Sequence, residues 1–521
     1  MKISKIEATR ESIRLHTPDG DGDVTVRESA ATIGEKAGRT LAMLPLPVES
    51  GTVSLPRFDG ARDRIYSRFT VFQANEEAKG VRYVTDIADD VPEDTSPYPQ
   101  PPTIKTLTGP ARVLKELGIR QSRPDVSLPG LMTMSPGENA IPYRFNGRTY
   151  YFIRSAVEAL DKQMLSAPVN TMILLNSPRL FGATGEKALL DACIHPRYDW
   201  NCPNAFISAF DMETEEGQNC YGAFVEFLVE RYSRPDKKYG CAAGAVISNE
   251  VNSQYVWGNA GEMPVEQYVR EYTQAMRLAW ICGAKHRKSF RVYVSLDQFW
   301  HGTNFDASSP GRYYSGRRVL DLIRQYAAED GDFNWNVAFH PYPEDLRWPD
   351  FWHDRTPDFT FSTPKITFKN MEVLEAYLSQ PDFLYRGKPR RILFSEQGFN
   401  SQNGKLKDLT EKMAEAGYVL AYLKARKMKT VDMFTHHACI DNPHEFGLNL
   451  GIFRYDASLP DHVGEKKPIY ASVAAMDTEK EPEAVRKARA FIGEDLFDYL
   501  LDPPLVHGDR DASGDNEFGN G

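Results

Sequence analysis

The chain has 521 residues, of which 62 are Lys or Arg and 72 are Asp or Glu, so its formal net charge is −10. This length and an apolar fraction of 41% predict a large globular core with room for an accessory domain. The net acidity argues against nucleic acid as a partner, and no apolar run reaches the roughly 20 residues that span a membrane. Six scattered cysteines without a C-x-x-C pair argue against a disulfide scaffold and a structural zinc site.

The N-terminal residues lack the apolar stretch of a secretory signal. We therefore expect a cytoplasmic protein, or a secreted or periplasmic one whose signal peptide has been removed. The sequence leaves the oligomeric state open.

The first hundred residues differ in pattern from the rest. Runs such as Val24–Arg27 and Ile65–Phe72 carry β-branched and aromatic residues at strand-like spacing, and five prolines then fall within residues 91–103. We predict that residues 1–105 form a β-rich accessory region with its linker. The polar, Gly-rich residues 505–521 are predicted to form a disordered tail.

From residue 106 the sequence alternates short apolar runs with amphipathic helical segments. Apolar strands that are each followed by a helix imply parallel strands covered on both faces. We therefore predict a (β/α)₈ TIM barrel over residues 106–504. A doubly wound sheet is the main alternative, but no Gly-rich phosphate loop follows any strand. The eight predicted strands are the run at Ile119, Thr171–Asn176, Phe206–Asp211, Ala243–Asn249, Phe290–Leu296, Asn336–His340, Arg391–Ser395 and Thr430–Thr435.

Two of these strands run directly into a glutamate. Glu250 follows the fourth predicted strand, and Glu396 follows the seventh. Catalytic groups of a barrel lie at the carboxyl ends of its strands, so both carboxylates are expected at one mouth. A pair of carboxylates in that place can protonate a glycosidic oxygen and attack, or activate water, at the anomeric carbon.

The order of motifs carries a resemblance to a known group of enzymes. Asn249-Glu250, the His340-Pro-Tyr342 segment and Glu396 stand in the order that resembles the clan A retaining glycoside hydrolases. The wider pattern, which includes the Asn-Gly hairpin within residues 143–152, also resembles a bacterial family of glycosidase-like proteins catalogued as a domain of unknown function.

The resemblance implies a role for each matching residue. Glu250 would be the acid/base, Asn249 would bind the substrate 2-hydroxyl, and Glu396 would be the nucleophile. Tyr342 would donate a hydrogen bond that keeps Glu396 ionised, and His340 would bind substrate nearby. The implied reaction is double displacement at a β-glycoside of hexose type, β-galactoside- or β-glucoside-like, in an oligo- or polysaccharide, without metal or organic cofactor. Sugar, linkage and exo or endo action stay open.

Several further positions are candidates for substrate binding. The eighth strand ends at His436 and His437 where many clan members have a Trp, and either histidine can face the site. The second predicted strand ends at Asn176 rather than at an Arg, so Arg123 or Arg179 would take the place of that Arg. The remaining candidates are Trp257, Asp297 and Trp300, for which core packing is the alternative.

Two other functions fit the sequence less well. A carbohydrate-binding protein on a degenerate barrel would keep the aromatic residues and lose a glutamate, yet both glutamates are present. A metal-dependent amidohydrolase needs His-x-His on its first strand, where Gln121-Ser-Arg123 stands instead.

Overall fold

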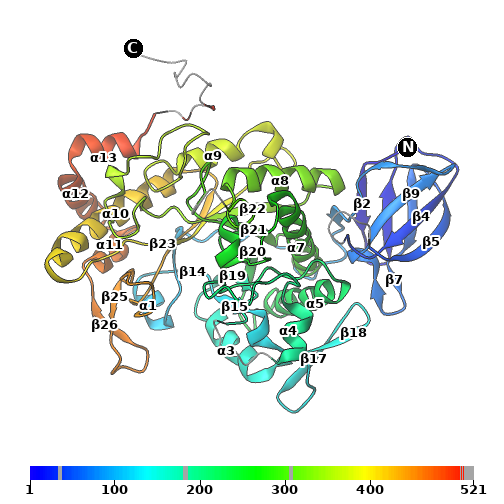
Figure 1. Cartoon of the computed structure of the whole chain (residues 1–521), viewed down its shortest axis with the longest axis horizontal. Coiled ribbons are helices and arrows are strands. Elements are labelled where there is room, and N and C mark those ends of the chain that lie inside the picture. Colours follow the sequence, from blue (N-terminus) through cyan, green and yellow to red (C-terminus); the bar gives the residue numbers. More distant parts are fainter. Residues whose placement is uncertain (33–37, 180–185, 304–308, 505, 507, 510–521) are drawn as a thin grey trace.

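The computed structural model describes residues 1–32, 38–179, 186–303, 309–504, 506, 508 and 509. The tail predicted at residues 505–521 lies almost wholly outside the described residues. Figure 1 shows three parts along the chain: an N-terminal lobe of strands, a central barrel, and a C-terminal group of helices beside it.

The N-terminal lobe consists mainly of two four-stranded sheets, with strand orders β10-β9-β4-β5 and β12-β2-β3-β6. Alternate residues of its strands are buried, as Val24 and Val26 are in β4, which is the period of a sheet with one covered face. The prediction of a β-rich region before the barrel is confirmed. Its strands are β1 Lys2–Ile3, β2 Lys5–Ala8, β3 Ser12–His16, β4 Asp23–Ser29, β5 Thr40–Pro47, β6 Thr52–Pro56, β7 Phe58–Asp59, β8 Arg62–Asp63, β9 Arg68–Gln73, β10 Glu76–Glu77, β11 Lys79–Gly80 and β12 Asp86–Ile87.

The central sheet is a closed parallel barrel. Its strands pair in the order β13-β24-β23-β22-β21-β20-β19-β14, and β14 pairs with β13 to close the ring. After Arg123-Pro124, β15 (Asp125–Ser127) continues the path of β14 along β19. The predicted (β/α)₈ fold is therefore confirmed. Its strands are β13 Lys105–Leu107, β14 Gln121–Ser122, β19 Val169–Leu175, β20 Ala242–Ile247, β21 Arg291–Leu296, β22 Trp335–Phe339, β23 Ile392–Gln397 and β24 Val431–His436.

The predicted strands four to eight match β20 to β24, but the first three are shifted. The first barrel strand, β13, has only three residues, two of them polar, so its sequence carries no apolar run. The run at Ile119 therefore leads into the second strand, and Thr171–Asn176 matches the third. The prediction of a strand at Phe206–Asp211 was wrong: this segment makes only single bridges, and it is apolar because it packs on the barrel interior.

Helices cover the outside of the barrel, as predicted. The predicted hairpin is also present: β17 (Ala140–Phe145) and β18 (Arg148–Ile153) pair around Asn146 and Gly147, whose φ values of 47° and 86° are those of a type I′ turn. The helices are α1 Ala111–Glu116, α2 Leu128–Leu131, α3 Arg154–Met164, α4 Lys187–Cys193, α5 Glu215–Tyr232, α6 Gln254–Trp257, α7 Val265–His286, α8 Gly316–Asp330, α9 Glu372–Leu378, α10 Lys407–Lys427, α11 Ile469–Ala475, α12 Glu481–Ile492 and α13 Glu494–Leu501; the remaining strands are β16 Met132–Thr133, β25 Phe453–Tyr455 and β26 Val463–Lys466.

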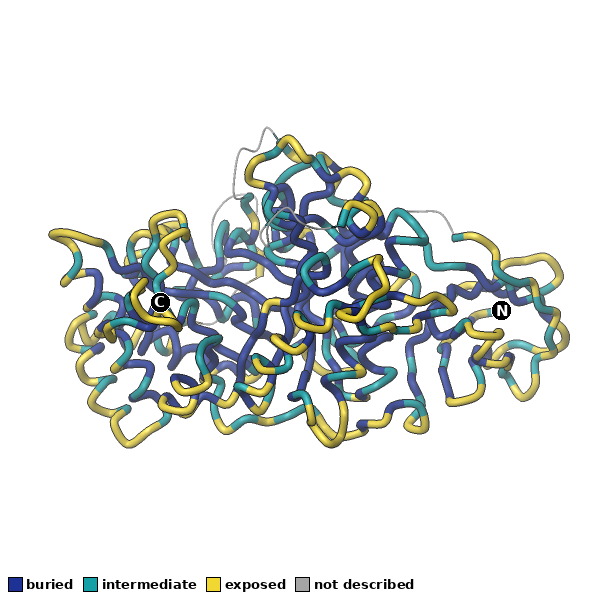
Figure 2. Tube along the Cα trace, turned by 90° about the horizontal axis from the view of Figure 1, so that it is seen from below, coloured by how far each residue is buried: buried dark blue, intermediate teal, exposed yellow. Residues whose placement is uncertain are grey.

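The barrel interior is packed with side chains. Residues from successive strands, among them Ile173, Val246, Tyr293, Leu393 and Met433, form one buried apolar cluster. Figure 2 shows buried chain running through the barrel and into the N-terminal lobe. A filled interior leaves the mouth, at the carboxyl ends of the strands, as the place for a site. Among the described helices, none combines the length and the apolar character that a membrane crossing requires.

Candidate active site

Glu250 stands just past the end of β20 in a strained backbone conformation. Its φ of 37° and that of Ser248, 63°, both lie in the left-handed region that residues with a Cβ seldom adopt. The backbone N–H of Glu250 donates to Ser295 Oγ at the end of β21, over 2.9 Å. Strain of this kind persists where surrounding contacts enforce it, and such sites are often functional.

Glu396 is the penultimate residue of β23, at the same mouth of the barrel as Glu250. Its side chain is 22% exposed, so it is reachable from solvent. The Tyr342 hydroxyl donates to Oε1 over 3.2 Å, and Arg123 Nη2 donates to Oε2 over 3.3 Å. Each carboxylate oxygen thus has one donor that fixes its orientation.

His340 stands between the two glutamates. Its Nδ1 lies 2.8 Å from Glu250 Oε1, and its Nε2 lies 3.0 Å from Ser395 Oγ. One ring nitrogen of His340, one oxygen of Glu250 and one oxygen of Glu396 all lie within 4.8 Å of one another. The structure therefore brings together the two glutamates and the His-Pro-Tyr segment that the sequence placed on three different strands.

The electrostatic surroundings keep Glu396 ionised. Burial alone would raise its pKa, but the nearby His437, His340 and Arg123, together with the hydrogen bond from Tyr342, lower the pKa to about 2. The reverse holds for Tyr342, because burial and the two glutamates raise its pKa well above 10, so its hydroxyl stays a donor. An ionised carboxylate held this way can act as a nucleophile or stabilise positive charge.

These residues lie in the part of the chain that a known family covers. The DUF5722 family, described as a family of unknown function, matches residues 97–499. The chain belongs to DUF5722. The match runs from the linker to α13, so it includes every barrel strand and both glutamates.

Other comparisons give distant likenesses. No curated protein matches the chain. A family 39 glycoside hydrolase from Bacteroides cellulosilyticus WH2 is 14% identical, with 91% of this chain and 81% of that chain covered and a TM-score of 0.44. A family 1 β-glucosidase from Thermotoga maritima is 10% identical, with 70% and 84% covered and a TM-score of 0.41. A glucosidase from Croceicoccus marinus is 11% identical, with 74% and 68% covered and a TM-score of 0.40.

Of the two candidate histidines in this DUF5722 chain, His437 is the one beside the glutamates. Its Nδ1 lies 3.2 Å from Arg123 Nη2, and its Nε2 lies 3.2 Å from Glu445 Oε1. Although burial alone would lower its pKa, Glu396 and Glu445 raise the pKa of His437 above the usual value. His436, which the sequence analysis also proposed, faces away: it is 2% exposed, and its Nε2 bonds the Leu450 carbonyl oxygen.

An aromatic wall borders the mouth. Trp257 packs against Phe206 with ring centroids 5.3 Å apart, and Phe206 packs against Phe446 at 6.0 Å. Phe206 and Trp257 both contact the apolar cluster inside the barrel, whereas Phe446 is 70% exposed and follows Glu445 directly. We use the name aromatic wall for Phe206, Trp257 and Phe446. Asn249 is half-buried there, and its side chain has no hydrogen bond with any described residue.

Two further predicted site residues do not line the mouth. Trp300 is fully buried, with its indole N–H on the Phe361 carbonyl oxygen and its ring against Tyr377, because the chain after β21 turns inward. Asn176 is fully buried, and its amide donates to the carbonyl oxygens of Cys193 and Ala209 over 2.7 and 3.0 Å. Both side chains are used to fix loops. The indole N–H and the amide N–H groups are occupied, and Asn176 Oδ1 is buried without a partner, so neither side chain is exposed to a sugar in this arrangement.

Asp297 holds the turn that follows Glu250 in place. It is buried, accepts hydrogen bonds from Ser253 Oγ and the Phe299 N–H, and is bonded by the Asn252 amide. These contacts tie the turn that follows Glu250 to the end of β21. Burial and the charge of Glu250 raise the pKa of Asp297 to about 7. Its geometry is that of a positioning residue for Glu250.

Sequence reasoning missed several contributors. Ser295 and Ser395 hold Glu250 and His340, but serines next to a strand end carry no distinguishing pattern. Glu445 and Phe446 lie in the loop after β24, outside any motif. Phe206 was placed inside a barrel strand, where an aromatic side chain would have faced the core.

Among the residues that the structure describes, two clusters of His and Glu have the proximity that a metal ion needs. In the mouth cluster, both ring nitrogens of His340 already have hydrogen-bond partners. In the second cluster, His195 Nδ1 accepts from the Arg197 N–H over 3.2 Å, so Nε2 carries the proton and donates to Glu271 Oε2 over 3.0 Å. Neither histidine offers a free lone pair, so neither donor set fits a metal site well.

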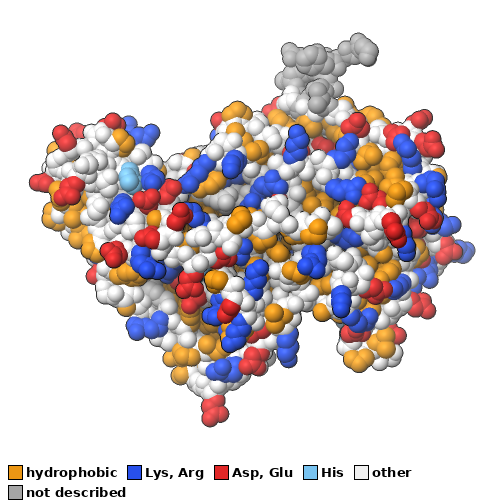
Figure 3. Space-filling view, turned by 180° about the vertical axis from the view of Figure 1, so that it is seen from behind, with side chains coloured by type: hydrophobic (Ala, Val, Ile, Leu, Met, Phe, Trp, Pro, Cys, Tyr) orange, Lys and Arg blue, Asp and Glu red, His pale blue; other side chains and the backbone are white. Residues whose placement is uncertain are grey.

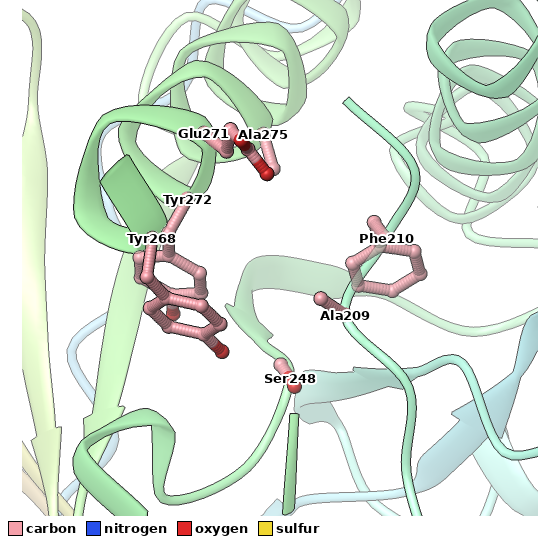
Figure 4. Close-up of a pocket in the computed structure, with 7 residues that line it drawn as sticks. All are labelled: Ala209, Phe210, Ser248, Tyr268, Glu271, Tyr272 and Ala275. Atoms are coloured by element: carbon pink, nitrogen blue, oxygen red, sulfur yellow. The ribbon is translucent and has the colours of Figure 1, made fainter. Parts of the chain in front are cut away.

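A small cavity lies beside Glu271, between α7 and the 206–211 segment (Figure 4). Its lining is mainly apolar and aromatic, with Phe210, Tyr268 and Tyr272 around it. Its volume of about 10 Å³ is room for a single water. It cannot hold a sugar.

Proposed function

We propose that this chain is a retaining glycoside hydrolase that cleaves a β-glycosidic bond of a hexose-type sugar, β-galactoside- or β-glucoside-like, in an oligo- or polysaccharide. The observation that carries the proposal is the carboxylate pair: oxygens of Glu250 and Glu396 lie within 4.8 Å at the barrel mouth. Retaining enzymes hold their carboxyl groups about 5–5.5 Å apart, whereas inverting enzymes leave about 6.5–9.5 Å for a water. The shorter spacing supports double displacement.

In the first step, Glu250 protonates the glycosidic oxygen while ionised Glu396 attacks the anomeric carbon. The C–O bond to the leaving group breaks, and a glycosyl ester forms on Glu396. In the second step, Glu250 takes a proton from water, the water oxygen attacks the anomeric carbon, and Glu396 leaves as a carboxylate. No metal or organic cofactor enters either step.

The side chains around the two glutamates each have a role in this mechanism. Arg123 and Tyr342 orient the Glu396 carboxylate and favour its charge in the resting enzyme. His340 holds one oxygen of Glu250, which leaves the other free to face the glycosidic oxygen. The unpartnered amide of Asn249 is available to the sugar 2-hydroxyl.

The aromatic wall supports a carbohydrate as the ligand. Aromatic faces pack against the apolar faces of sugar rings, and Phe446 is exposed enough to do so. Sugar identity and linkage are matters for a substrate panel. We place the catalytic unit within residues 106–504, with residues 1–105 as the accessory region and linker.

Two alternatives are less well supported. A non-catalytic carbohydrate-binding protein has no need for a nucleophile whose pKa is held near 2 or for a strained acid/base beside it. A metal-dependent amidohydrolase requires His-x-His on the first strand, and β13 reads Lys105-Thr-Leu107.

The test is hydrolysis of a panel of aryl β-glycosides by the wild type, Glu250→Ala and Glu396→Ala, with and without azide. We expect azide to rescue Glu250→Ala with a β-glycosyl azide as product, and to yield an α-glycosyl azide from the otherwise inactive Glu396→Ala. Glu271→Gln, which removes a buried carboxylate outside the mouth, is the matched control. An aryl glycoside cleaved equally well by the wild type and both alanine variants would overturn the proposal.

A further inference from the structure

A second polar cavity lies where the N-terminal lobe meets the barrel, and we call it the seam cavity. Its volume is about 340 Å³, and the lining includes Arg68 of β9, Arg82 after β11, and Arg270 and Arg277 of α7. Asp330, another lining residue, ends α8 five residues before β22 begins, so the cavity lies toward the amino ends of the barrel strands. It is therefore at the end of the barrel opposite the glutamates.

Three of these arginines have charged or carbonyl partners, although Arg82 Nε is buried without a hydrogen bond. Arg277 donates to backbone carbonyl oxygens of the chain at the end of α8 and stacks on Tyr83. Arg82 pairs with Glu77 over 2.7 Å and Arg270 with Glu329 over 3.4 Å.

Arg68 is not satisfied. It is 7% exposed, and its Nε has no hydrogen-bond partner. Its one bond goes from Nη1 to Thr70 Oγ1 over 3.0 Å, and no carboxylate of the described residues lies within ion-pair distance of it. Burial lowers its pKa, which Tyr83 and Asp330 only partly offset, and Arg82 and Arg27 lower it further.

A second guanidinium converges on the same point. Arg27 of β4 donates from Nη2 to Thr70 Oγ1 over 3.4 Å, and its Nε is also buried without a partner. Two guanidinium groups on one hydroxyl, without a carboxylate between them, repel each other in a medium that screens charge poorly. Four arginines line the cavity, and they face the lining carboxylates of Glu329 and Asp330 and the carboxylate of Glu77, which pairs with Arg82. The surplus positive charge of the lining is thus concentrated at Arg68, and Arg27 adds to it from the other side of Thr70.

We propose that the seam cavity binds a small oxyanion, a phosphate or sulfate group that is either free or carried by a small molecule. Planar guanidinium groups bind such oxygens in bidentate fashion, and the anion would supply the missing partner of Arg68, with Arg82 beside it in the lining. A polyanion fits less well, because basic and acidic side chains are interspersed on the face that Figure 3 shows, without a continuous basic stripe.

The position of the seam cavity gives the anion a structural consequence. The backbone N–H groups of Arg82 and Tyr83 donate to the Asp330 carbonyl oxygen over 3.0 and 3.2 Å, so the lobe and α8 are already in contact there. An anion on Arg68, beside Arg82 and α7, would strengthen the docking of the lobe on the barrel. Binding to the folded chain alone would raise its stability.

The test is isothermal titration of the full chain with sodium phosphate and with sodium sulfate, at an ionic strength fixed with sodium chloride. We expect saturable binding near one anion per chain, with a rise in Tm that chloride does not give. Arg68→Gln should weaken binding about tenfold or more, since a charge-assisted hydrogen bond is lost. Arg318→Gln, at an exposed position of α8 outside the cavity, removes the same charge and should bind as the wild type does.

Two further measurements show whether the bound anion is free or part of a small molecule, and whether each variant is folded. Glucose 6-phosphate or glucose 6-sulfate that binds more tightly than the inorganic anion identifies a group carried by a small molecule, and equal or weaker binding identifies the free anion. Arg68→Lys keeps the charge without the planar fork, and Tm in chloride alone reports whether each variant folds. The proposal is overturned if the wild type shows no saturable binding, or if folded Arg68→Gln and Arg68→Lys both bind as the wild type does. Glycosidase activity enters none of these measurements.

Discussion

The two ends of the barrel both carry charged side chains, but these are used differently. At the amino end, Asp432 lies between Arg291 and Arg391, and the ring of Tyr98 from the linker covers Arg291 at 3.6 Å. We call these four residues the floor cluster. The Asp432 side chain is 9% exposed and paired on both oxygens, so the cluster is closed.

The mouth has the same residue types in an open arrangement. Oxygens of Glu250 and Glu396 lie within 4.8 Å, and the side chains are 14% and 22% exposed. Glu250 adopts a left-handed backbone, and the Asn249 amide is unpartnered among the described residues. Charges that satisfy one another hold a fold together. Charges left close, strained and reachable are arranged for a ligand.

The sharpest way to separate the two ends is to remove one carboxylate from each. We expect Glu396→Gln to lower kcat by about 10³-fold or more, because the glycosyl ester can no longer form. Asp432→Asn should keep kcat within about threefold, since nothing in the floor cluster touches substrate. Steady-state kinetics on one cleaved aryl glycoside measures both, and a large loss of kcat in Asp432→Asn would erase the distinction.

The same two variants should rank in the opposite order by their loss of unfolding free energy. Asp432→Asn leaves two arginines without their partner, and breaking a buried ion pair costs about 3–5 kcal/mol. Glu396→Gln should cost less, because the Glu396 side chain is 22% exposed and Arg123 keeps its ion pair with Asp125. Denaturant titration at neutral pH gives both values. Equal losses of unfolding free energy would contradict the contrast.

A charge near Glu396 should set the acid limb of the pH profile. Arg123→Gln removes a positive charge that lowers the pKa of Glu396, so that pKa rises and the carboxylate stays protonated to a higher pH. The acid limb of kcat/KM should therefore move toward neutral pH by about one unit or more. Arg391→Gln in the floor cluster is the control, and it should leave the limb in place. An acid limb that both variants leave unmoved would separate Arg123 from catalysis.

The smallest expected effect concerns the two tryptophans. Trp257→Ala should raise KM about tenfold with a modest change in kcat, because a stacked aromatic ring contributes mainly to sugar binding. Trp300→Phe should leave KM unchanged and lower Tm, since Trp300 is buried against Tyr377. Substrate saturation curves for both variants give the two KM values. A raised KM in Trp300→Phe alone would reverse the assignment.

The glutamates could be predicted from sequence because each ends an apolar run, and strand ends of a barrel meet at one mouth. Partners that depend on which way a side chain turns could not be predicted in the same way. His436 and His437 are adjacent, and only the end of β24 decides that His437 faces Arg123. Trp257 and Trp300 both follow a strand in the sequence. Only the structure shows that Trp300, after β21, is fully buried.

An apolar run in the sequence can also be either a barrel strand or a segment that packs over the barrel interior. Residues 206–211 read as a strand because they are apolar, yet they are apolar because they close over the barrel interior. The seam cavity could not be predicted from the sequence, since its arginines come from β9, from the segment after β11 and from α7, which lie far apart along the chain.

The most direct test of the account is the stereochemistry of the first product, followed by proton NMR during rapid hydrolysis of an aryl β-glycoside that the enzyme cleaves. Because the two carboxylates lie within 4.8 Å, we predict that the β-anomer appears first and the α-anomer only later, at the rate of mutarotation. Initial appearance of the α-anomer would show inversion and would contradict the assignment of Glu396 as the nucleophile.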